Sequence, residues 1–219
     1  MPEKEVAEAI IHLYRRGFIT LSEGNVSIRD GERFFITPGG LRKDRVRPED
    51  IAVVGLDGKI IKGKPSSEYR LHLAIYRIRN DINAIVHTHP PFAVALAVSG
   101  ISLEYPVLAE AVTFLGPVPI VPFELPSTDA LAERAGEFIK KYDNLLLENH
   151  GAVTTAENLD LGLALMETLE HTAEVLWKAL FIGRIKIFDR SEVEKLLSLR
   201  KTYGLSHRPW RAEDFRYNL

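Results

Sequence analysis

The 219-residue chain contains no cysteine, so it can form neither a disulfide nor a thiolate–metal bond. Any bound metal ion must therefore be held by histidine and carboxylate side chains. No apolar run approaches the roughly 18 residues that would suggest a membrane span. The N-terminus, Met1 to Glu5, lacks the basic-then-apolar pattern of a signal peptide. Together these absences predict a cytoplasmic protein that does not contact a membrane.

The chain also lacks a strong excess of charge of either sign. It has 28 Lys and Arg residues against 30 Asp and Glu residues, which gives a formal net charge of −2 at pH 7. This balance supplies no broad positive field for nucleic acid or for an acidic lipid surface. Any anion that the protein binds must therefore be held by a local site.

What the chain does have is an ordinary globular composition, with 46% hydrophobic and 26% charged residues. Its length is sufficient to bury a substantial core. Because we find no internal repeat, low-complexity run or linker, we expect a single domain over 1–219. Within it, the polar and aromatic residues 206–219 are expected to form a C-terminal tail.

The most informative stretch is Ile82 to Pro90, a mostly apolar run that ends in His-Thr-His-Pro. Its length, and the Asp81 that precedes it, predict a short buried strand. Because successive strand side chains point to opposite faces, His87 and His89 point the same way. Two imidazoles on one face can hold one metal ion, although isolated His-x-His pairs are often only half-exposed strand positions.

A candidate third ligand, His150, follows another apolar run and precedes Gly151. It would complete a site with three protein ligands and one open coordination position, which is the arrangement of catalytic zinc. A structural zinc site is the alternative, but such sites have four protein ligands, and the sequence offers only three strong ones. At this point His150 is a candidate third ligand beside His87 and His89.

Hydrophobic periodicity and turn signals outline the remaining elements. Helices are expected over 3–16, 91–99, 129–141, 158–181 and 191–203. Strands are expected in two hairpins, 24–36 and 51–61, and over 118–122 and 144–147. Hairpins interspersed with helices predict a layered α/β or α+β sheet with helices on its faces.

One more helix opens at Pro65-Ser66-Ser67-Glu68, with Leu71, Ile75 and Ile78 as its expected buried stripe. Either serine is a good N-cap. Paired hydroxyls at a helix N-terminus can also hold phosphate, although an ordinary cap explains the same pattern. We expect His72, four residues after Glu68, to be a surface partner on the same helix face and not a metal ligand.

Five short segments, taken together, resemble one family. They occur in the family's order across about residues 5–180, and they are Gly24-Asn25-Val26-Ser27, Thr37-Pro38-Gly39-Gly40, Lys64-Pro65-Ser66-Ser67-Glu68, His87-Thr88-His89-Pro90 and Asn149-His150-Gly151. The chain resembles the class II aldolase/adducin family, and most closely its zinc-dependent L-fuculose-1-phosphate aldolases. The resemblance implies a three-layer α/β/α sandwich with a mainly antiparallel central sheet. It also implies a homotetramer with active sites at subunit contacts.

Residue by residue, the resemblance implies that zinc is bound by His87, His89 and His150 and that Glu68 is the catalytic acid/base. It implies a substrate-phosphate site formed by Asn25, Gly40, Ser66 and Ser67.

Two features depart from the family pattern or stay open. The family's loop commonly has Ser or Thr where this chain has Gly39, so one phosphate hydrogen bond is expected to be lost or moved to the backbone. For the proton-donating tyrosine of the aldolases, Tyr105 and Tyr217 are the nearest candidates. Glu110 is another polar residue that could face the site.

These residue types fit aldol chemistry. A proton removed beside a ketone leaves negative charge on oxygen, which a metal ion with an open position stabilises as a Lewis acid. Glu68 can take that proton, provided that partial burial raises its pKa toward neutrality. The sequence thus predicts reversible, metal-dependent aldol cleavage of a ketose 1-phosphate to dihydroxyacetone phosphate and a short aldehyde, such as lactaldehyde or glycolaldehyde.

Several alternatives remain open from the sequence. The same fold hosts ribulose-5-phosphate 4-epimerases, a methylthioribulose-1-phosphate dehydratase and sugar-acid phosphate decarboxylases, all of which use a metal and a phosphate site. The short chain and the His-Thr-His-Pro segment favour the aldolase. A non-catalytic adducin-like interaction domain would not need three histidines and an acid in place. The native ion is expected to be zinc, with another divalent metal as the alternative.

Overall fold

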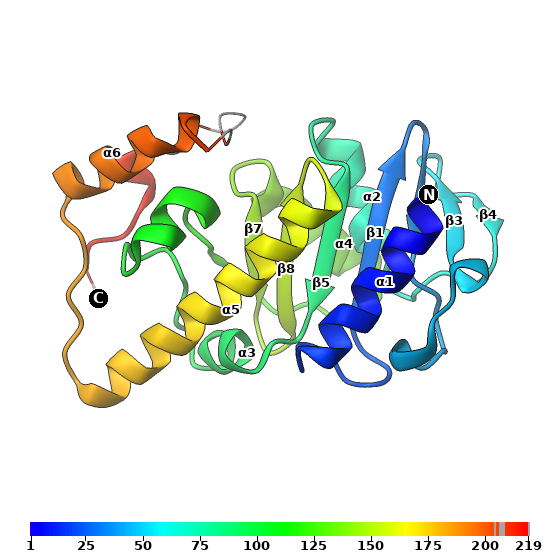
Figure 1. The fold of residues 1–219 in the computed structure, drawn as a ribbon, viewed down its shortest axis with the longest axis horizontal. Helices are drawn as coiled ribbons and strands as arrows, with labels where there is room; N and C mark the ends of the chain where they lie inside the picture. Colours follow the sequence, from blue (N-terminus) through cyan, green and yellow to red (C-terminus); the bar gives the residue numbers. More distant parts are fainter. Residues whose placement is uncertain (204, 206–208, 219) are drawn as a thin grey trace.

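A computed structural model describes residues 1–203, 205 and 209–218, and its centre is an eight-stranded sheet (Figure 1). The strands lie in the order β4-β3-β2-β1-β5-β8-β7-β6, and only β6 and β7 run parallel. Their bounds are β1 (Asn25–Asp30), β2 (Arg33–Ile36), β3 (Ala52–Gly55), β4 (Ile60–Lys62), β5 (Ala84–Thr88), β6 (Ile120–Val121), β7 (Asn144–Leu147) and β8 (Gly151–Ala156). The expected α/β fold with a mainly antiparallel sheet is confirmed.

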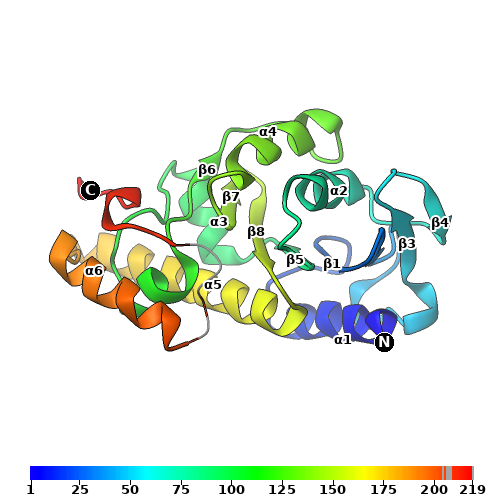
Figure 2. The ribbon, with the colours of Figure 1, turned by 90° about the horizontal axis from the view of Figure 1, so that it is seen from above.

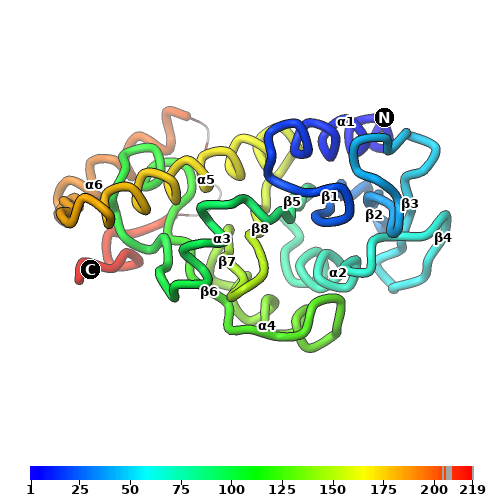
Figure 3. The backbone as a smooth tube through the Cα atoms, turned by 90° about the horizontal axis from the view of Figure 1, so that it is seen from below, coloured from blue at the N-terminus to red at the C-terminus, as the bar shows by residue number. Residues whose placement is uncertain are grey.

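Helices cover both faces of this sheet and complete the three layers. Their bounds are α1 (Pro2–Arg15), α2 (Tyr69–Ile78), α3 (Pro91–Val98), α4 (Asp129–Ile139), α5 (Leu159–Ile182) and α6 (Arg190–Ser198). Figure 2 shows α1 and α5 on one face, with α2 and α4 on the other. A separate hydrophobic cluster lies on each side of the sheet, one including α1, α3 and α5 and the other α2 and α4. The two termini lie at opposite ends of the molecule (Figure 3).

Strand β1 shows how the sequence selects these layers. Val26 and Ile28 point toward the layer of α1 and α5 and join its apolar cluster. The alternate residues, Asn25 and Ser27, are polar and buried on the opposite face, where they meet α2. A strand that is buried on both faces normally carries apolar residues on both. Two buried polar residues on one face of β1 therefore mark a polar site inside the fold.

Helix α2 differs from the sequence expectation in two ways. It begins at Tyr69, with Glu68 at the N-cap, and Ser66 Oγ accepts the Glu68 N–H at 3.4 Å. Its buried stripe includes Leu71, His72, Ile75 and Tyr76, while Ile78 is 36% exposed. The assignment of His72 to the helix surface was wrong: its side chain is fully buried against β1, because β1 offers it polar partners there.

The sequence reading missed the three 3-10 turns Lys43–Arg45, Pro48–Asp50 and Ala212–Asp214, and two elements nearer the site. Strand β8 begins directly after His150 and pairs with both β5 and β7, so it lies next to the centre of the sheet. Residues Ala111–Leu115 form a π-helical turn. Both are built from small or weakly patterned sequence, which gives little periodic signal.

The expected C-terminal tail is only partly covered, because 206–208 and 219 lie outside the described residues. Within the part that is described, Ala212 and Phe215 pack in a small apolar cluster with Val112 of the π-helical turn and Val193 of α6. None of the helices in the described ranges is long and apolar enough to cross a membrane.

Candidate metal centre and active site

The candidate metal centre lies where β1, β5 and β8 end on the face covered by α2. Antiparallel pairing places Asn25 of β1 directly opposite His87 of β5. His89 follows two residues later on the same side, as the strand period requires. His150 is delivered by the turn between β7 and β8, in which Asn149 takes a left-handed φ of 53°. Glu68 reaches the same point from the start of α2.

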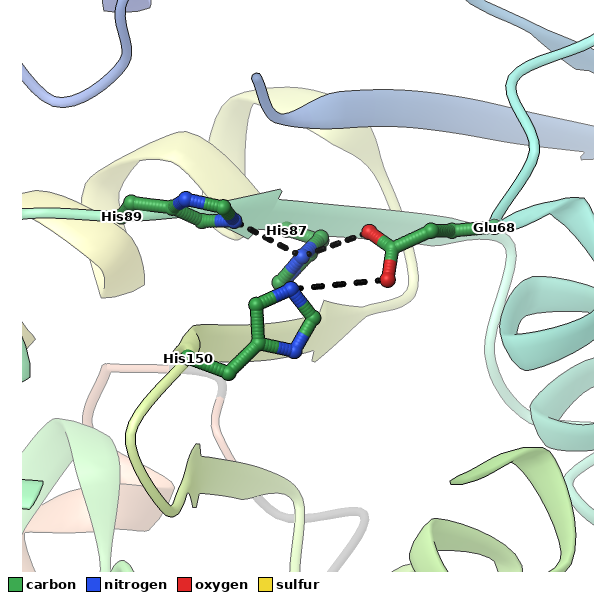
Figure 4. A group of neighbouring side chains, drawn as sticks. All are labelled: Glu68, His87, His89 and His150. Atoms are coloured by element: carbon green, nitrogen blue, oxygen red, sulfur yellow. Dashed lines mark hydrogen bonds and ion pairs between the residues drawn. The ribbon is translucent and has the colours of Figure 1, made fainter. Parts of the chain in front are cut away.

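The four side chains converge, as Figure 4 shows. His87 Nε2 lies 3.2 Å from His89 Nε2 and 2.9 Å from Glu68 Oε2. His150 Nε2 lies 3.5 Å from Glu68 Oε1. All four potential ligand atoms lie within 4.8 Å of one another. The structure therefore brings together the four residues that the sequence singled out as metal ligands and acid/base.

The spacing of these atoms fits a single ion. Two nitrogen ligands of one tetrahedral zinc ion, each about 2.1 Å from it, lie about 3.4 Å apart. Three of the separations between ligand atoms are 2.9, 3.2 and 3.5 Å, close to that value, and the others are at most 4.8 Å. Glu68 Oε1 is buried and has no hydrogen-bond partner among the described residues. A cation between these groups would satisfy it, so the donor set fits a divalent metal.

Two of the three histidines are prepared to act as neutral ligands, and the third is oriented by the backbone. His87 donates its Nδ1–H to the carbonyl oxygen of Ala152 at 3.0 Å, so its Nε2 faces the cluster, where a bound metal ion would replace the Nε2 proton that Glu68 favours. Burial, helped by the neighbouring His87, lowers the pKa of His89 to about 3 and that of His150 to about 4. A neutral imidazole is the form that binds a metal, so these two rings need not lose a proton first.

The charge state of Glu68 differs from the sequence expectation. Burial alone would raise the pKa of its carboxyl, as expected. However, the charge and hydrogen bond of His87, with contributions from His150 and Asn25, hold the pKa of Glu68 below its usual value. The carboxylate in turn raises the pKa of the buried His87. In this arrangement Glu68 is ionised, because its cationic and hydrogen-bonding neighbours outweigh desolvation.

Gly151 lets the backbone pass close to the centre. A Cβ at this position would lie 2.5 Å from Thr88 O, 2.7 Å from His89 Cδ2 and 3.1 Å from His87 Cε1. Real Cβ contacts are essentially never that short, so any side chain here would displace β5 or the rings. The Asn-His-Gly order thus has a steric reason.

Three of the residues expected to hold phosphate, Gly40, Ser66 and Ser67, lie on two segments that run side by side. Gly39 N donates to Lys64 O at 3.0 Å, and Ser66 N donates to Thr37 O at 3.0 Å. Gly40 takes a positive φ of 78°, which favours glycine. Ser66 is buried, whereas Ser67 is exposed and its Oγ accepts a hydrogen bond from Ser127.

Asn25 connects this region to the metal centre. It is 2% exposed, and its Nδ2 donates to Glu68 Oε2 at 3.2 Å. Glu68 in turn follows directly after Ser66 and Ser67 in the chain. Asn25, Ser66 and Ser67 therefore lie at the start of α2, next to the four-residue cluster, and Gly40 follows the Gly39–Lys64 contact.

A cation near this loop was missed by the sequence reading. Lys43 is 2% exposed, and its Nζ donates to the carbonyl oxygen of Pro38 at 2.9 Å. Lys64 lies on the other, exposed side, with its Nζ 3.9 Å from where a Cβ of Gly40 would be. The signal available in the sequence was Lys43 itself, three residues after Gly40.

The candidates for the proton donor are not brought to the cluster. Tyr217 donates its hydroxyl to Ala212 O at 2.9 Å within the C-terminal segment. Tyr105 is half-buried in the loop before the π-helical turn, and Glu110 is exposed. Among the described residues, no contact joins any of the three to the histidines or Glu68.

Comparisons with known proteins agree with this geometry. Residues 4–177 match the family described as the class II aldolase and adducin N-terminal domain. The chain is 38% identical over 186 residues to a 5-deoxy-D-ribulose 1-phosphate aldolase of Bacillus thuringiensis, covering 83% of this chain and 86% of that protein. It is 37% identical over 175 residues to an L-fuculose phosphate aldolase of Methanocaldococcus jannaschii, covering 80% and 95%.

Solved structures show the same fold. An L-fuculose 1-phosphate aldolase superposes with a TM-score of 0.86 at 26% identity, covering 93% of this chain and 96% of that one. The combined matches identify an aldolase, an enzyme that breaks and forms carbon–carbon bonds. The chain belongs to the class II aldolase and adducin family, close to the L-fuculose-1-phosphate aldolases.

Proposed function

We propose that this chain catalyses the reversible aldol cleavage of a ketose 1-phosphate to dihydroxyacetone phosphate and a short aldehyde. The observation that carries this proposal is the convergence of three imidazoles and one carboxylate, with all ligand atoms within 4.8 Å. Three nitrogen ligands with room for a substrate oxygen are typical of catalytic zinc. We therefore assign His87, His89 and His150 as metal ligands and zinc as the native ion.

The ion would supply Lewis-acid stabilisation of the negative charge that develops on the substrate oxygens. Glu68 handles the proton on carbon. In the synthetic direction its carboxylate takes a proton from the carbon beside the ketone of dihydroxyacetone phosphate. In the cleavage direction it returns that proton to the same carbon after the carbon–carbon bond has broken. The electron pair of the broken bond stays with the ketone half. The other half becomes the aldehyde as its hydroxyl releases a proton to solvent, and Glu68 takes up a proton from solvent before it protonates the carbon.

Asn25, Gly40, Ser66 and Ser67 are assigned to the substrate phosphate. Phosphate binding at the start of α2 would hold the substrate through a group that does not react, and so convert binding energy into orientation. Because Asn25 also contacts Glu68, the phosphate site and the base are one polar unit. A substrate without phosphate is therefore expected to lose turnover as well as affinity.

The aldehyde half is the open part of the substrate assignment. One relative is named for 5-deoxy-D-ribulose 1-phosphate and others for L-fuculose phosphate. Both are ketose 1-phosphates that share the dihydroxyacetone phosphate half and differ in the aldehyde that is released. We therefore propose a ketose 1-phosphate whose cleavage releases a short aldehyde.

A coupled assay tests the proposal directly. Several ketose 1-phosphates, including those of fuculose and 5-deoxyribulose, are offered to zinc-loaded protein, and dihydroxyacetone phosphate is measured with and without chelator. Chelator-sensitive triose phosphate release is the expected result. Release of carbon dioxide or water, or epimerised product with no triose phosphate, would instead identify a decarboxylase, a dehydratase or an epimerase.

Two variants separate the assigned roles. His89→Ala should lose bound zinc and turnover together, and full activity without metal would overturn the metal assignment. Glu68→Gln should retain zinc but lose exchange of the carbon-bound proton of dihydroxyacetone phosphate with solvent. Exchange at the wild-type rate would remove Glu68 from its role as the base.

A further inference from the structure

A buried chain of hydrogen bonds leads from the core to Glu68. Tyr76 OH lies 2.8 Å from Ser27 Oγ, and Ser27 Oγ lies 2.6 Å from His72 Nδ1. His72 Nε2 lies 2.5 Å from Asn25 Oδ1, and Asn25 Nδ2 lies 3.2 Å from Glu68 Oε2. All five side chains are at most 8% exposed. The chain alternates between α2 and β1, so it links the two layers at the site.

The contacts along this chain set the direction of its protons. Asn25 Nδ2 is the atom that donates to Glu68 Oε2, at 3.2 Å, so the Asn25 group that faces Glu68 is the NH2. Asn25 Oδ1 then faces His72, whose Nε2 must carry the hydrogen. His72 Nδ1 is left bare and accepts from the Ser27 hydroxyl. The Ser27 oxygen can finally accept from Tyr76.

His72 is able to hold this arrangement because it stays neutral. Burial, together with the nearby His87, lowers the pKa of His72 to about 3. A neutral imidazole has one N–H donor and one acceptor nitrogen, and its partners decide which is which. Ser27 and Asn25 occupy the two nitrogens, so the ring has one satisfied tautomer.

We propose that His72 is a positioning residue, which fixes the side-chain amide of Asn25 so that its NH2 group faces Glu68 and the substrate phosphate. This inference rests on the proposed function, because it assigns a supporting residue to the same site. A flipped amide would turn Oδ1 toward a carboxylate and a phosphate, both of which are acceptors. The bond from His72 Nε2 opposes that flip, because a flipped amide would face the Nε2–H with its own NH2.

This role gives a reason for His72 and Ser27 on faces of α2 and β1 that are otherwise apolar. An apolar residue at either position would fit the space between α2 and β1. It would leave Asn25 Oδ1 without a donor in a buried site, and the two amide orientations would become closer in energy. Residues that orient active groups in this way typically contribute about 10- to 100-fold to activity or affinity.

The test compares two substitutions at the same position. His72→Gln supplies an amide N–H toward Asn25 and an amide oxygen toward Ser27, whereas His72→Leu fills the space with neither. Inorganic phosphate is the probe, and its dissociation constant is measured by calorimetry on zinc-loaded protein. The Michaelis constant for the ketose 1-phosphate is measured alongside. We expect His72→Leu to weaken both by about tenfold or more, to keep its zinc, and His72→Gln to recover most of the loss.

A matched control separates positioning from packing. Thr155→Val removes another buried hydroxyl from the sheet, one that donates to Asp143 O at 2.7 Å and does not touch Asn25. It should lower thermal stability but leave phosphate binding unchanged. If His72→Leu does not fold, Ser27→Ala serves instead, and it should weaken phosphate binding because the His72 proton is then free to move to Nδ1.

Nitrogen-15 spectra of His72 add a direct signature, for which an Nε2–H tautomer is expected. An Nδ1–H tautomer, or equal phosphate affinity in wild type and His72→Leu, would overturn the inference. Equal losses in His72→Leu and His72→Gln would assign the effect to packing and also overturn it. A phosphate effect that persists in a protein unable to cleave any ketose 1-phosphate would count against the aldol reaction and leave the role of His72 standing.

Discussion

Lys43 provides the sharpest quantitative prediction. Its ammonium group is almost fully buried beneath the Thr37–Gly40 loop, and its Nζ donates to the carbonyl oxygen of Pro38. Among the described residues no carboxylate pairs with it. Burial lowers the pKa of Lys43 from 10.5 to about 8. The folded protein therefore holds a charge that destabilises it, and Lys43→Met, which keeps a long unbranched stem, removes that charge.

The sign and size follow from proton linkage. Below pH 8 both folded and unfolded chains carry the Lys43 proton, and the full cost of burying the charge is present. Between pH 8 and 10.5 the unfolded chain binds more protons, so the free energy of unfolding rises with pH. A shift from 10.5 to about 8 corresponds to about 3 kcal/mol at pH 7, falling to about 1 kcal/mol at pH 10. Losing the hydrogen bond to Pro38 offsets about 1 kcal/mol.

Lys43→Met is therefore expected to be more stable than the wild type by about 2 kcal/mol at pH 7 and about equal at pH 10. Urea unfolding at several pH values measures the difference, in which all other titrating groups cancel. Lys64→Met is the control, because Lys64 is exposed on the neighbouring segment and should change stability by less than about 0.5 kcal/mol at any pH. A difference between wild type and Lys43→Met that does not vary with pH would refute the reasoning.

Three further predictions concern the support of the site and the assembly. Gly151→Ala should lower zinc occupancy and cost about 1–3 kcal/mol of stability, because its Cβ would lie 2.5 Å from Thr88 O. The control is Gly162→Ala, whose Cβ would make only ordinary contacts, and metal analysis should find its zinc content unchanged. Glu170→Gln should lower the stability in thermal unfolding by about 1 kcal/mol, because the Glu170 carboxylate accepts two N–H groups at the start of α3, just after His89; an unchanged melting temperature would contradict this. We also predict a homotetramer, which light scattering would reveal as four times the 24.7 kDa mass of one chain, and Phe181→Glu, which alters an 87% exposed aromatic on α5, should shift that mass downward.

The sequence was sufficient to predict the centre of the site, because strand alternation is a local rule. His87 and His89 had to share a face once the segment was a strand, and the register with Asn25 only completed what the spacing implied. His150 was reachable as a candidate because it ended a second apolar run. Its arrival at the same point was a statement about tertiary structure, which came from the family resemblance and not from periodicity.

His72 shows where a local reading fails. Its position four residues after Glu68 places both on one helix face, and a polar pair on one face normally indicates solvent. The face is buried because β1 presents Asn25 and Ser27 to it, and sequence periodicity does not show which residues of another element will lie opposite. The prediction of a raised pKa for Glu68 failed for the same reason. Burial raises the pKa of this carboxyl and its partners lower it, and only the distances in the fold decide which effect is larger.

Gly39 lacks the hydroxyl that the family usually has at this position, but its missing side chain allows close backbone packing. Compared with the family's usual hydroxyl residue, glycine lacks a side chain that could bind the substrate phosphate. In the fold, a Cβ at this position would lie 2.7 Å from Pro65 O, and the Gly39 amide already donates to Lys64 O. The glycine thus allows the loop to lie directly against the segment that carries Ser66 and Glu68. Its own N–H is committed to that contact, so we propose that a backbone hydrogen bond to the substrate phosphate comes from Gly40, which has a left-handed φ of 78°.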